Sequence, residues 1–116
     1  MDTDTRNNCL FCKIADKKIN ANFVHEDEQS FSIRDIAPQA PSHILIIPRE
    51  HFENISAVDN THLLGSLFQK ATAIAQKEGM HNGFRLVVNS GEEGGQTVGH
   101  LHIHLLAGRP LQWPPG

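Results

Sequence analysis

Three histidines, His100, His102 and His104, occupy alternate positions in "GHLHIHLLAG", residues 99–108. In a β-strand, alternate side chains share one face, so the three imidazoles would lie together while the aliphatic residues between them face the other way. Successive histidines would be about 6.6–6.8 Å apart, and the outer two about 13 Å apart. Because zinc binds imidazole nitrogen at about 2.0–2.1 Å, this spacing disfavours one zinc ion held by all three. The remaining interpretations are a catalytic site and a solvent-exposed strand face.

A glycine-rich loop, "SGEEGGQTVG" over residues 90–99, directly precedes the histidines. Glycines let backbone N–H groups approach an anion closely, and Gln96, Thr97 and the upstream Asn89 add neutral hydrogen-bonding groups. The loop lacks the spacing of a P-loop or a Rossmann turn, and by itself it would be an ordinary hairpin loop. Beside three aligned histidines, it favours a phosphate-binding site.

A histidine can attack phosphorus near neutral pH because its unperturbed pKa is about 6.5. One ring nitrogen must then be unprotonated, while the other holds its proton against a fixed acceptor. The middle residue, His102, suits the role of nucleophile, with His104 donating a hydrogen bond to a phosphate oxygen. We therefore expect covalent catalysis at this segment.

Apolar periodicity and turn residues predict the elements that position this site. Helices are expected over residues 9–19 and 60–78, and strands over residues 22–26, 30–36, 42–48, 84–89 and 100–107. Gly79 is a natural stop for the long helix, and the prolines of "APQAP" make residues 37–41 a rigid connection. Short links between several strands favour an α+β fold with a mainly antiparallel sheet.

The length of 116 residues predicts a single domain over residues 1–116, with residues 1–8 flexible and residues 107–116 forming a C-terminal tail near the active site. A net charge of −3 argues against a nucleic-acid binder. The start lacks the layout of a secretory signal, and no apolar run approaches the roughly 20 residues of a membrane span. With two cysteines, a disulfide framework is not expected, so a cytoplasmic protein is the simplest expectation.

Together, "HLHIHLLAG", the preceding "GGQTVG" and the upstream "DIAPQAPSHILIIP" resemble the histidine-triad (HIT) superfamily, and in motif the Hint-like purine nucleoside phosphoramidases. The similarity runs from "FCKI" through the final "WPPG". It implies a HIT-like α+β fold, with a five-stranded antiparallel sheet and one short and one long helix, and a homodimer that joins two sheets. It also implies hydrolysis of the P–N bond of nucleoside 5′-phosphoramidates, or of aminoacyl-adenylates, through a nucleotidyl-histidine intermediate that releases AMP or GMP. No cofactor is expected to be required for this chemistry.

The resemblance also implies roles for individual residues. His102 is the nucleophile, His104 bonds phosphate, His100 orders the site and His43 lies behind the triad. The remaining matches are phosphate or leaving-group contacts at Asn89, Gly95, Gln96 and Thr97, a ribose contact at Asp35, an apolar nucleobase pocket of Phe11, Ile14, Ile19, Ile33 and Ile36, and a contact from Trp113 to the other subunit's site. The apolar pocket residues have the alternative of being simple core. Thr97, Gly99 and Ala107 depart from the usual pattern without removing a reactive group, which leaves the substrate range open.

A C-x2-C pair, Cys9 and Cys12, suggests a metal site in a cytoplasmic protein. By the same resemblance, these cysteines, His51 and His100 match a structural zinc set in some relatives. The alternative is two small buried hydrophobic residues. His25, His62 and His81 have no partners in the pattern and are expected at the surface.

Two other functions stay open at this point. One is a dinucleoside polyphosphate hydrolase of a sister branch, which the "WPPG" end and "PQAPSH" make less favoured. The other is a zinc-containing or nucleotide-binding scaffold protein without turnover, against which the intact His102 argues.

Overall fold

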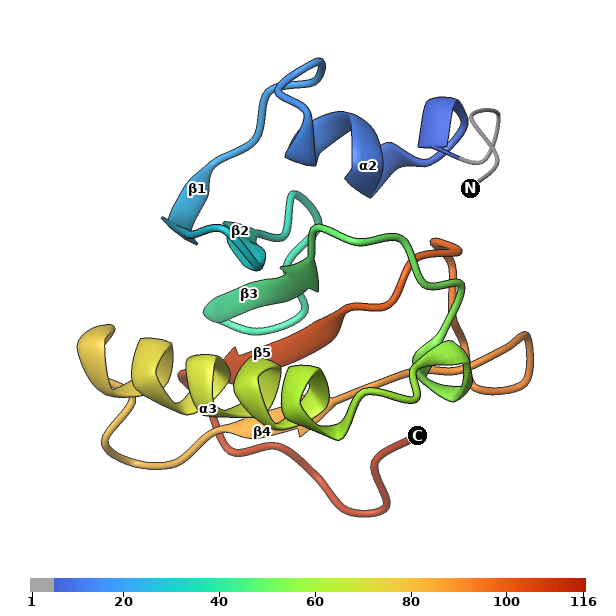
Figure 1. Ribbon diagram of the computed structural model, residues 1–116. Helices are drawn as coiled ribbons and strands as arrows, with labels where there is room; N and C mark the ends of the chain where they lie inside the picture. Colours follow the sequence, from blue (N-terminus) through green and yellow to red (C-terminus); the bar gives the residue numbers. More distant parts are fainter. Residues whose placement is uncertain (1–5) are drawn as a thin grey trace.

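The computed structural model describes residues 6–116, which form a five-stranded antiparallel sheet with the order β1-β2-β3-β5-β4 (Figure 1). The strands are β1 (Phe23–Glu26), β2 (Ser30–Arg34), β3 (Ser42–Pro48), β4 (Arg85–Val87) and β5 (Ile103–Ala107). The helices are α2 (Leu10–Ala15) and α3 (Thr61–Lys77), with one 3-10 turn, η1 (Ile55–Ala57). The predicted α+β class, with one short and one long helix, is confirmed.

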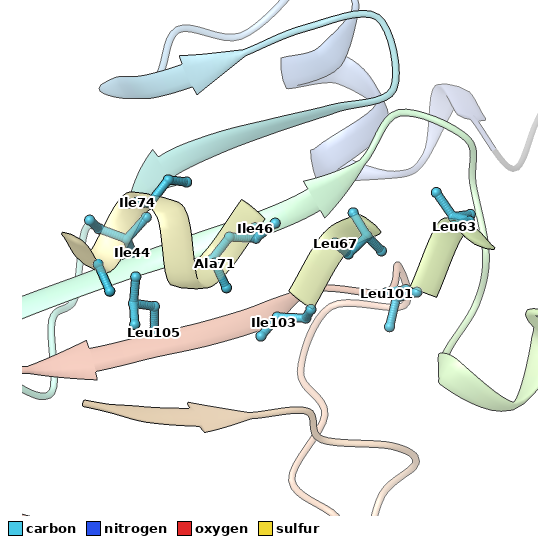
Figure 2. Close-up of a cluster of buried hydrophobic side chains, with 10 residues drawn as sticks. Ile44, Ile46, Leu63, Leu67, Ala71, Ile74, Leu101, Ile103 and Leu105 are labelled. Carbon is cyan, nitrogen blue, oxygen red and sulfur yellow. The ribbon is translucent and has the colours of Figure 1, made fainter. Parts of the chain in front are cut away.

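The sheet has two buried faces, and each face is covered by one helix. On β3, Ile44 and Ile46 point towards α3, whereas Leu45 and Ile47 pack in a second cluster with α2. Figure 2 shows the α3 face, where aliphatic side chains of the helix meet those of β3 and β5. The buried members of that cluster are Ile44, Ile46, Leu63, Leu67, Ala71, Ile74, Ala75, Leu101, Ile103 and Leu105.

The aliphatic residues between the three histidines lie in the α3 cluster. Because side chains alternate along an extended segment, the histidines are directed to the opposite face, which is the face that α2 covers. Leu45 of that face lies directly opposite His104 in the pairing of β3 with β5. Burial of the aliphatic side against α3 therefore fixes which way the histidines point.

The long helix begins and ends where the sequence predicts. The Asn60 side chain caps it by accepting from the N–H of Leu63 at 3.1 Å. Gly79 follows the helix with φ +77°, the left-handed conformation that favours glycine. The short helix is shorter than predicted and ends at Ala15, since Lys17 takes φ +63° and turns the chain.

The predicted strand over residues 100–107 is wrong in its first three residues, because the sheet pairing begins at Ile103. The N–H of Leu101 donates to the carbonyl of Phe52 at 2.7 Å, and that of His100 to the carbonyl of Val98 at 2.8 Å. These bonds bend the backbone away from the ladder, so His100 lies outside the strand. The predicted strands at 30–36 and 84–89 are likewise reduced to β2 and β4.

The described chain starts just before α2, and its C-terminal end lies beyond β4, on the opposite side of the sheet (Figure 1). Residues 1–5 of the start that was predicted to be flexible lie outside the described residues. The next residue, Arg6, donates to both carboxylate oxygens of Asp16 at 3.0 Å. The tail passes β4, where the Arg85 guanidinium donates to the carbonyl of Gln112 at 2.9 Å. Within residues 6–116, no helix has the length and apolar character needed to span a membrane.

Candidate active site

His102 has a defined tautomer. Its Nδ1 lies 2.7 Å from the carbonyl oxygen of His100, and since a carbonyl can only accept, Nδ1 carries the proton. Nε2 is then the unprotonated nitrogen. Phe11 of α2 packs edge-on against the ring at 5.0 Å between centroids, which fixes its orientation. His102 thus meets the requirement for an imidazole nucleophile.

His104 is set by a chain of hydrogen bonds that begins at a backbone amide. The N–H of Gln39 donates to Nδ1 of His43 at 3.0 Å, so the proton of His43 resides on Nε2. That Nε2 lies 2.9 Å from Nδ1 of His104, which accepts from it. His104 therefore carries its own proton on Nε2, as a hydrogen-bond donor. Asp35 Oδ2 lies 3.5 Å from Nε2 of His43 and supports the same proton.

Burial keeps these imidazoles neutral. It lowers the pKa of His104 to about 4, and the neighbouring His102 and His43 add to the effect. Burial also lowers the pKa of His43 and of His102 below the ordinary value. At neutral pH, the group therefore holds a free lone pair on His102 and a neutral donor on His104.

A cavity of about 290 Å³ opens beside His102 and His104. Polar groups, including Asp35 and Thr97, line it together with a larger apolar wall from α2, β2 and the segment that follows α2. The five predicted nucleobase residues are all in this wall: Phe11, Ile14, Ile19, Ile33 and Ile36. Ile36 is 98% exposed and Ile19 38% exposed, so these two are not simple core, whereas the other three also pack in the α2 cluster.

The glycine-rich loop is held in shape by Gln96. Its amide nitrogen donates to the carbonyls of Glu53 at 2.7 Å and Val98 at 2.9 Å, and its oxygen accepts from the N–H of Gly91 at 3.0 Å. Gly95 has φ +85°. Thr97 lines the triad cavity, while Gly95 and Gln96 line a neighbouring depression that Thr97 also borders. Asn89 is half-buried just before the loop.

Cys9, Cys12, His51 and His100 converge behind the triad, with their ligand atoms within 4.8 Å of one another. Nδ1 of His100 lies 3.2 Å from Sγ of Cys9 and 3.2 Å from Nδ1 of His51, and Sγ of Cys12 lies 3.4 Å from Nδ1 of His51. A tetrahedral zinc ion with ordinary bond lengths separates its ligand atoms by about 3.3–3.8 Å. The four groups therefore fit a Cys2His2 site of the closed, structural kind.

The surroundings of His100 support this fit. Its Nε2 lies 2.8 Å from the carbonyl of Pro48, which fixes the proton there and leaves the Nδ1 lone pair directed to the cluster. Burial lowers the pKa of His100 to about 4 and raises that of Cys12 to about 12. His100 thus joins two sites: its ring belongs to the Cys/His cluster, and its carbonyl orients His102.

The remaining predicted residues lie away from the cavity. Trp113 is 81% exposed on the tail, and within the described residues the tail adds nothing to the cavity wall. His25, His62 and His81 are exposed, as expected. The residues that the sequence did not single out are the backbone groups of Pro48 and Gln39, which set tautomers, and Asn20 in the cavity wall. Backbone partners leave no side-chain signal, although "PQAPSH" marks the Gln39–His43 segment.

Comparisons with known proteins agree with this architecture. The sequence profile of the HIT domain matches residues 16–111. An uncharacterised HIT-like protein of Synechococcus elongatus is 50% identical over 109 residues, which cover 92% of this chain and 96% of that protein. A 14 kDa zinc-binding protein of Zea mays is 44% identical over 111 residues, covering 92% and 87%. A crystal structure of a HIT family hydrolase from Legionella pneumophila superposes with a TM-score of 0.91 at 49% identity, covering 94% of this chain and all of that one.

Proposed function

This chain belongs to the HIT domain family, and from that premise we propose that it hydrolyses nucleoside 5′-phosphoramidates at the P–N bond, or aminoacyl-adenylates. For an aminoacyl-adenylate, the corresponding bond is the one from phosphorus to the acyl oxygen. The observation that carries the proposal is the 2.7 Å bond from His102 Nδ1 to the His100 carbonyl, which leaves Nε2 unprotonated beside the cavity. A similar protein described as a HIT family hydrolase supports hydrolysis in general.

The reaction has two displacements at phosphorus. In the first, Nε2 of His102 forms a bond to phosphorus, the bond to the leaving amine breaks, and its electron pair stays on nitrogen. The amine takes up a proton, for which the Thr97 hydroxyl and His104 Nε2–H are the groups at the cavity. In the second, water attacks phosphorus and releases its proton, the bond to His102 breaks, and AMP or GMP leaves.

Charge on the phosphate oxygens is met by neutral donors. His104 Nε2–H is fixed by the chain from Gln39 through His43, so no reorganisation is needed when negative charge develops. We assign Thr97, and the loop positions Asn89, Gly95 and Gln96 around it, to the phosphate and leaving-group side. We assign the ribose hydroxyls to Asp35, whose Oδ1 accepts from the N–H of Ala37 at 2.8 Å and whose Oδ2, 3.5 Å from His43 Nε2, has a further lone pair for a hydroxyl. The apolar wall receives the base.

Zinc at the Cys/His cluster is the second part of the proposal. Cys9, Cys12, His51 and His100 would hold it, and the similarity to a zinc-binding protein of Zea mays supports that assignment. Bound zinc supplies structural cross-linking of α2 to the segment before β5. His100, held at its Nδ1, then keeps its carbonyl in place for His102. We also propose a cytoplasmic homodimer, to which the exposed tail with Trp113 contributes.

One comparison tests the activity against its alternatives. Purified protein is incubated with adenosine 5′-phosphoramidate and, separately, with diadenosine polyphosphate, and AMP release is followed. Preferential cleavage of the phosphoramidate is expected. Preferential cleavage of the dinucleotide would assign the sister activity, and nucleotide binding without cleavage of either would leave a scaffold protein.

A further inference from the structure

One hydrogen-bonding side chain in the triad cavity has no part in the chemistry described above. The polar side chains along the cavity belong to Asn20, Arg34, Asp35, Thr97, His102 and His104. The Arg34 guanidinium is engaged with Glu78 at 2.6 Å, just after α3 on the far face of the sheet. Asp35, Thr97 and the histidines serve the ribose, the leaving group and the phosphate. Asn20 remains.

Asn20 lines this cavity from the segment after α2, which also supplies part of the apolar wall. Its chain neighbours Ile19 and Ala21 line the same wall, together with Ile14 and Ile33. A nucleotide that puts its phosphate on His102 and its ribose on Asp35 extends its base towards this apolar wall. Among the side chains there, Asn20 is the one that carries both a donor and an acceptor.

The backbone around Asn20 is held on both sides. Before it, the N–H of Lys18 donates to the carbonyl of Lys13 at 2.8 Å, closing the end of α2. After it, Ala21 packs on the α2 cluster, and the carbonyl of Asn22 accepts from the N–H of Arg34 at 3.0 Å. The Asn20 side chain is exposed at the cavity and makes no hydrogen bond within residues 6–116, so its amide is available to a ligand.

We propose that Asn20 is a specificity-determining residue, whose amide bonds the polar edge of the base and lets the site accept both purines. This rests on the proposed function in so far as the cavity receives a nucleotide. In one orientation the amide accepts from the adenine amino group and donates to a ring nitrogen. Turned over, it donates to the guanine O6 and accepts from N1–H. A carboxylate at this position could only accept, and it would therefore fit the two adjacent N–H donors of guanine alone.

The test compares Asn20→Asp with a matched control, Asn22→Asp. Asn22 is exposed, lies two residues away and is outside the cavity wall. Its replacement by Asp therefore adds the same charge without contacting the base. The ratio of kcat/KM for adenosine and guanosine 5′-phosphoramidates is measured for each protein, and the affinities for AMP and GMP are measured by calorimetry. Both nucleotides share the phosphate, so a general effect of the added charge cancels in the ratio.

Asn20→Asp is expected to shift both ratios towards guanine by about tenfold or more, the discrimination of a bidentate base contact. Asn22→Asp should leave them within about twofold, and Asn20→Leu should weaken both purines alike. Unchanged ratios in a folded Asn20→Asp protein, or no binding of AMP or GMP to the native protein, would overturn the inference. If binding shifts but no phosphoramidate is cleaved, the proposed function fails and the assignment of Asn20 stands.

Discussion

At the residue scale, the protonation pattern of the candidate site depends on groups that hydrogen-bond to His102 and His104. His43 is buried, and its Nδ1 accepts a hydrogen bond from the backbone N–H of Gln39. Its Nε2 therefore carries the proton and donates to Nδ1 of His104. Because burial lowers the pKa of both imidazoles, the pair is neutral at pH 7, and the direction of each proton is fixed by its partner. A change at His43 should therefore act on the reaction through His104.

Replacing His43 by phenylalanine tests this dependence. The ring fills the space but leaves Nδ1 of His104 without its donor, so we expect kcat/KM to fall by about tenfold, the equivalent of one lost hydrogen bond. His43→Gln can still donate through its amide and should recover part of the loss. If steady-state kinetics shows the same loss of kcat/KM in folded His43→Phe and His43→Gln, the hydrogen bond from His43 does not set the tautomer of His104.

The spacing of the three histidines, together with the glycine-rich loop before them, predicts a phosphate-binding site with His102 as nucleophile, and both stay predictions. It did not show that the residues before Ile103 leave the sheet, because the bond from the Leu101 N–H to Phe52 is a contact 49 positions distant in sequence. The same holds for the carbonyl of Pro48, which orients His100. Tertiary backbone contacts of this kind leave no local pattern.

At the element scale, the turn between β1 and β2 is tied to α3 by one carboxylate. Asp27 accepts from the N–H of Gln29 at 2.8 Å and of Ser30 at 2.9 Å, and it pairs with Lys70 of α3. Burial by itself raises the pKa of Asp27, but Lys70 and the two backbone donors outweigh it, so this pKa lies well below its usual range. The unfolded chain therefore binds the proton more tightly, and the stability due to this charge is present above about pH 4 and is lost as pH falls towards the folded pKa.

Asp27→Asn separates the charge from the turn geometry. Its amide oxygen can still accept the backbone bonds, so we expect the free energy of unfolding to fall by about 1–2 kcal/mol at pH 7 and by much less near pH 3. Urea unfolding at the two pH values measures the difference, with Glu28→Gln, an exposed neighbour, as the control. A loss that does not depend on pH would contradict the role of the charge.

Helix α2 brings the two cysteines and Phe11 to the triad face, and zinc at the cluster would make this short helix stable. We expect about one zinc ion per chain in the native protein, as for other Cys2His2 sites. Cys9→Ala should remove it and lower the melting temperature by several degrees. His81→Ala, which changes an exposed histidine, should retain the metal. If elemental analysis finds no zinc in native protein that was purified without chelator, the proposed zinc site is ruled out.

Much of the fold could be predicted from residues within and next to each helix and strand. The long helix was predicted over residues 60–78 with Gly79 as its stop, and the structure has it at Thr61–Lys77 with Gly79 following in the left-handed conformation. The strand at residues 42–48 was predicted to the residue, since its apolar run is bounded by the rigid 37–41 segment and Pro48. The short helix and the other four strands were predicted too long, because their ends are decided by pairing with other elements and by the turn at Lys17.

At the scale of the whole molecule, β4 forms one edge of the sheet, and it is the strand at which the proposed homodimer would join two sheets. Leu86 and Val88 pack against the α3 cluster, whereas Val87 between them does not. A charge on an edge strand opposes pairing with another chain. Val87→Glu should therefore turn a dimer into a monomer in sedimentation velocity, while Asn22→Glu, beside the opposite edge strand, should not. Native protein that sediments as a monomer would refute the dimer.

The proposed reaction depends on a covalent bond between His102 and the substrate phosphorus. The direct measurement is to mix the protein with adenosine 5′-phosphoramidate, quench it in alkaline denaturant, where phosphorus–nitrogen bonds to imidazole persist, and map the adduct by mass spectrometry. We predict an adenylyl group on His102, no adduct in His102→Asn, and a loss of turnover of at least about a thousandfold in that variant. An adduct on another residue, or full turnover by folded His102→Asn, would contradict the account.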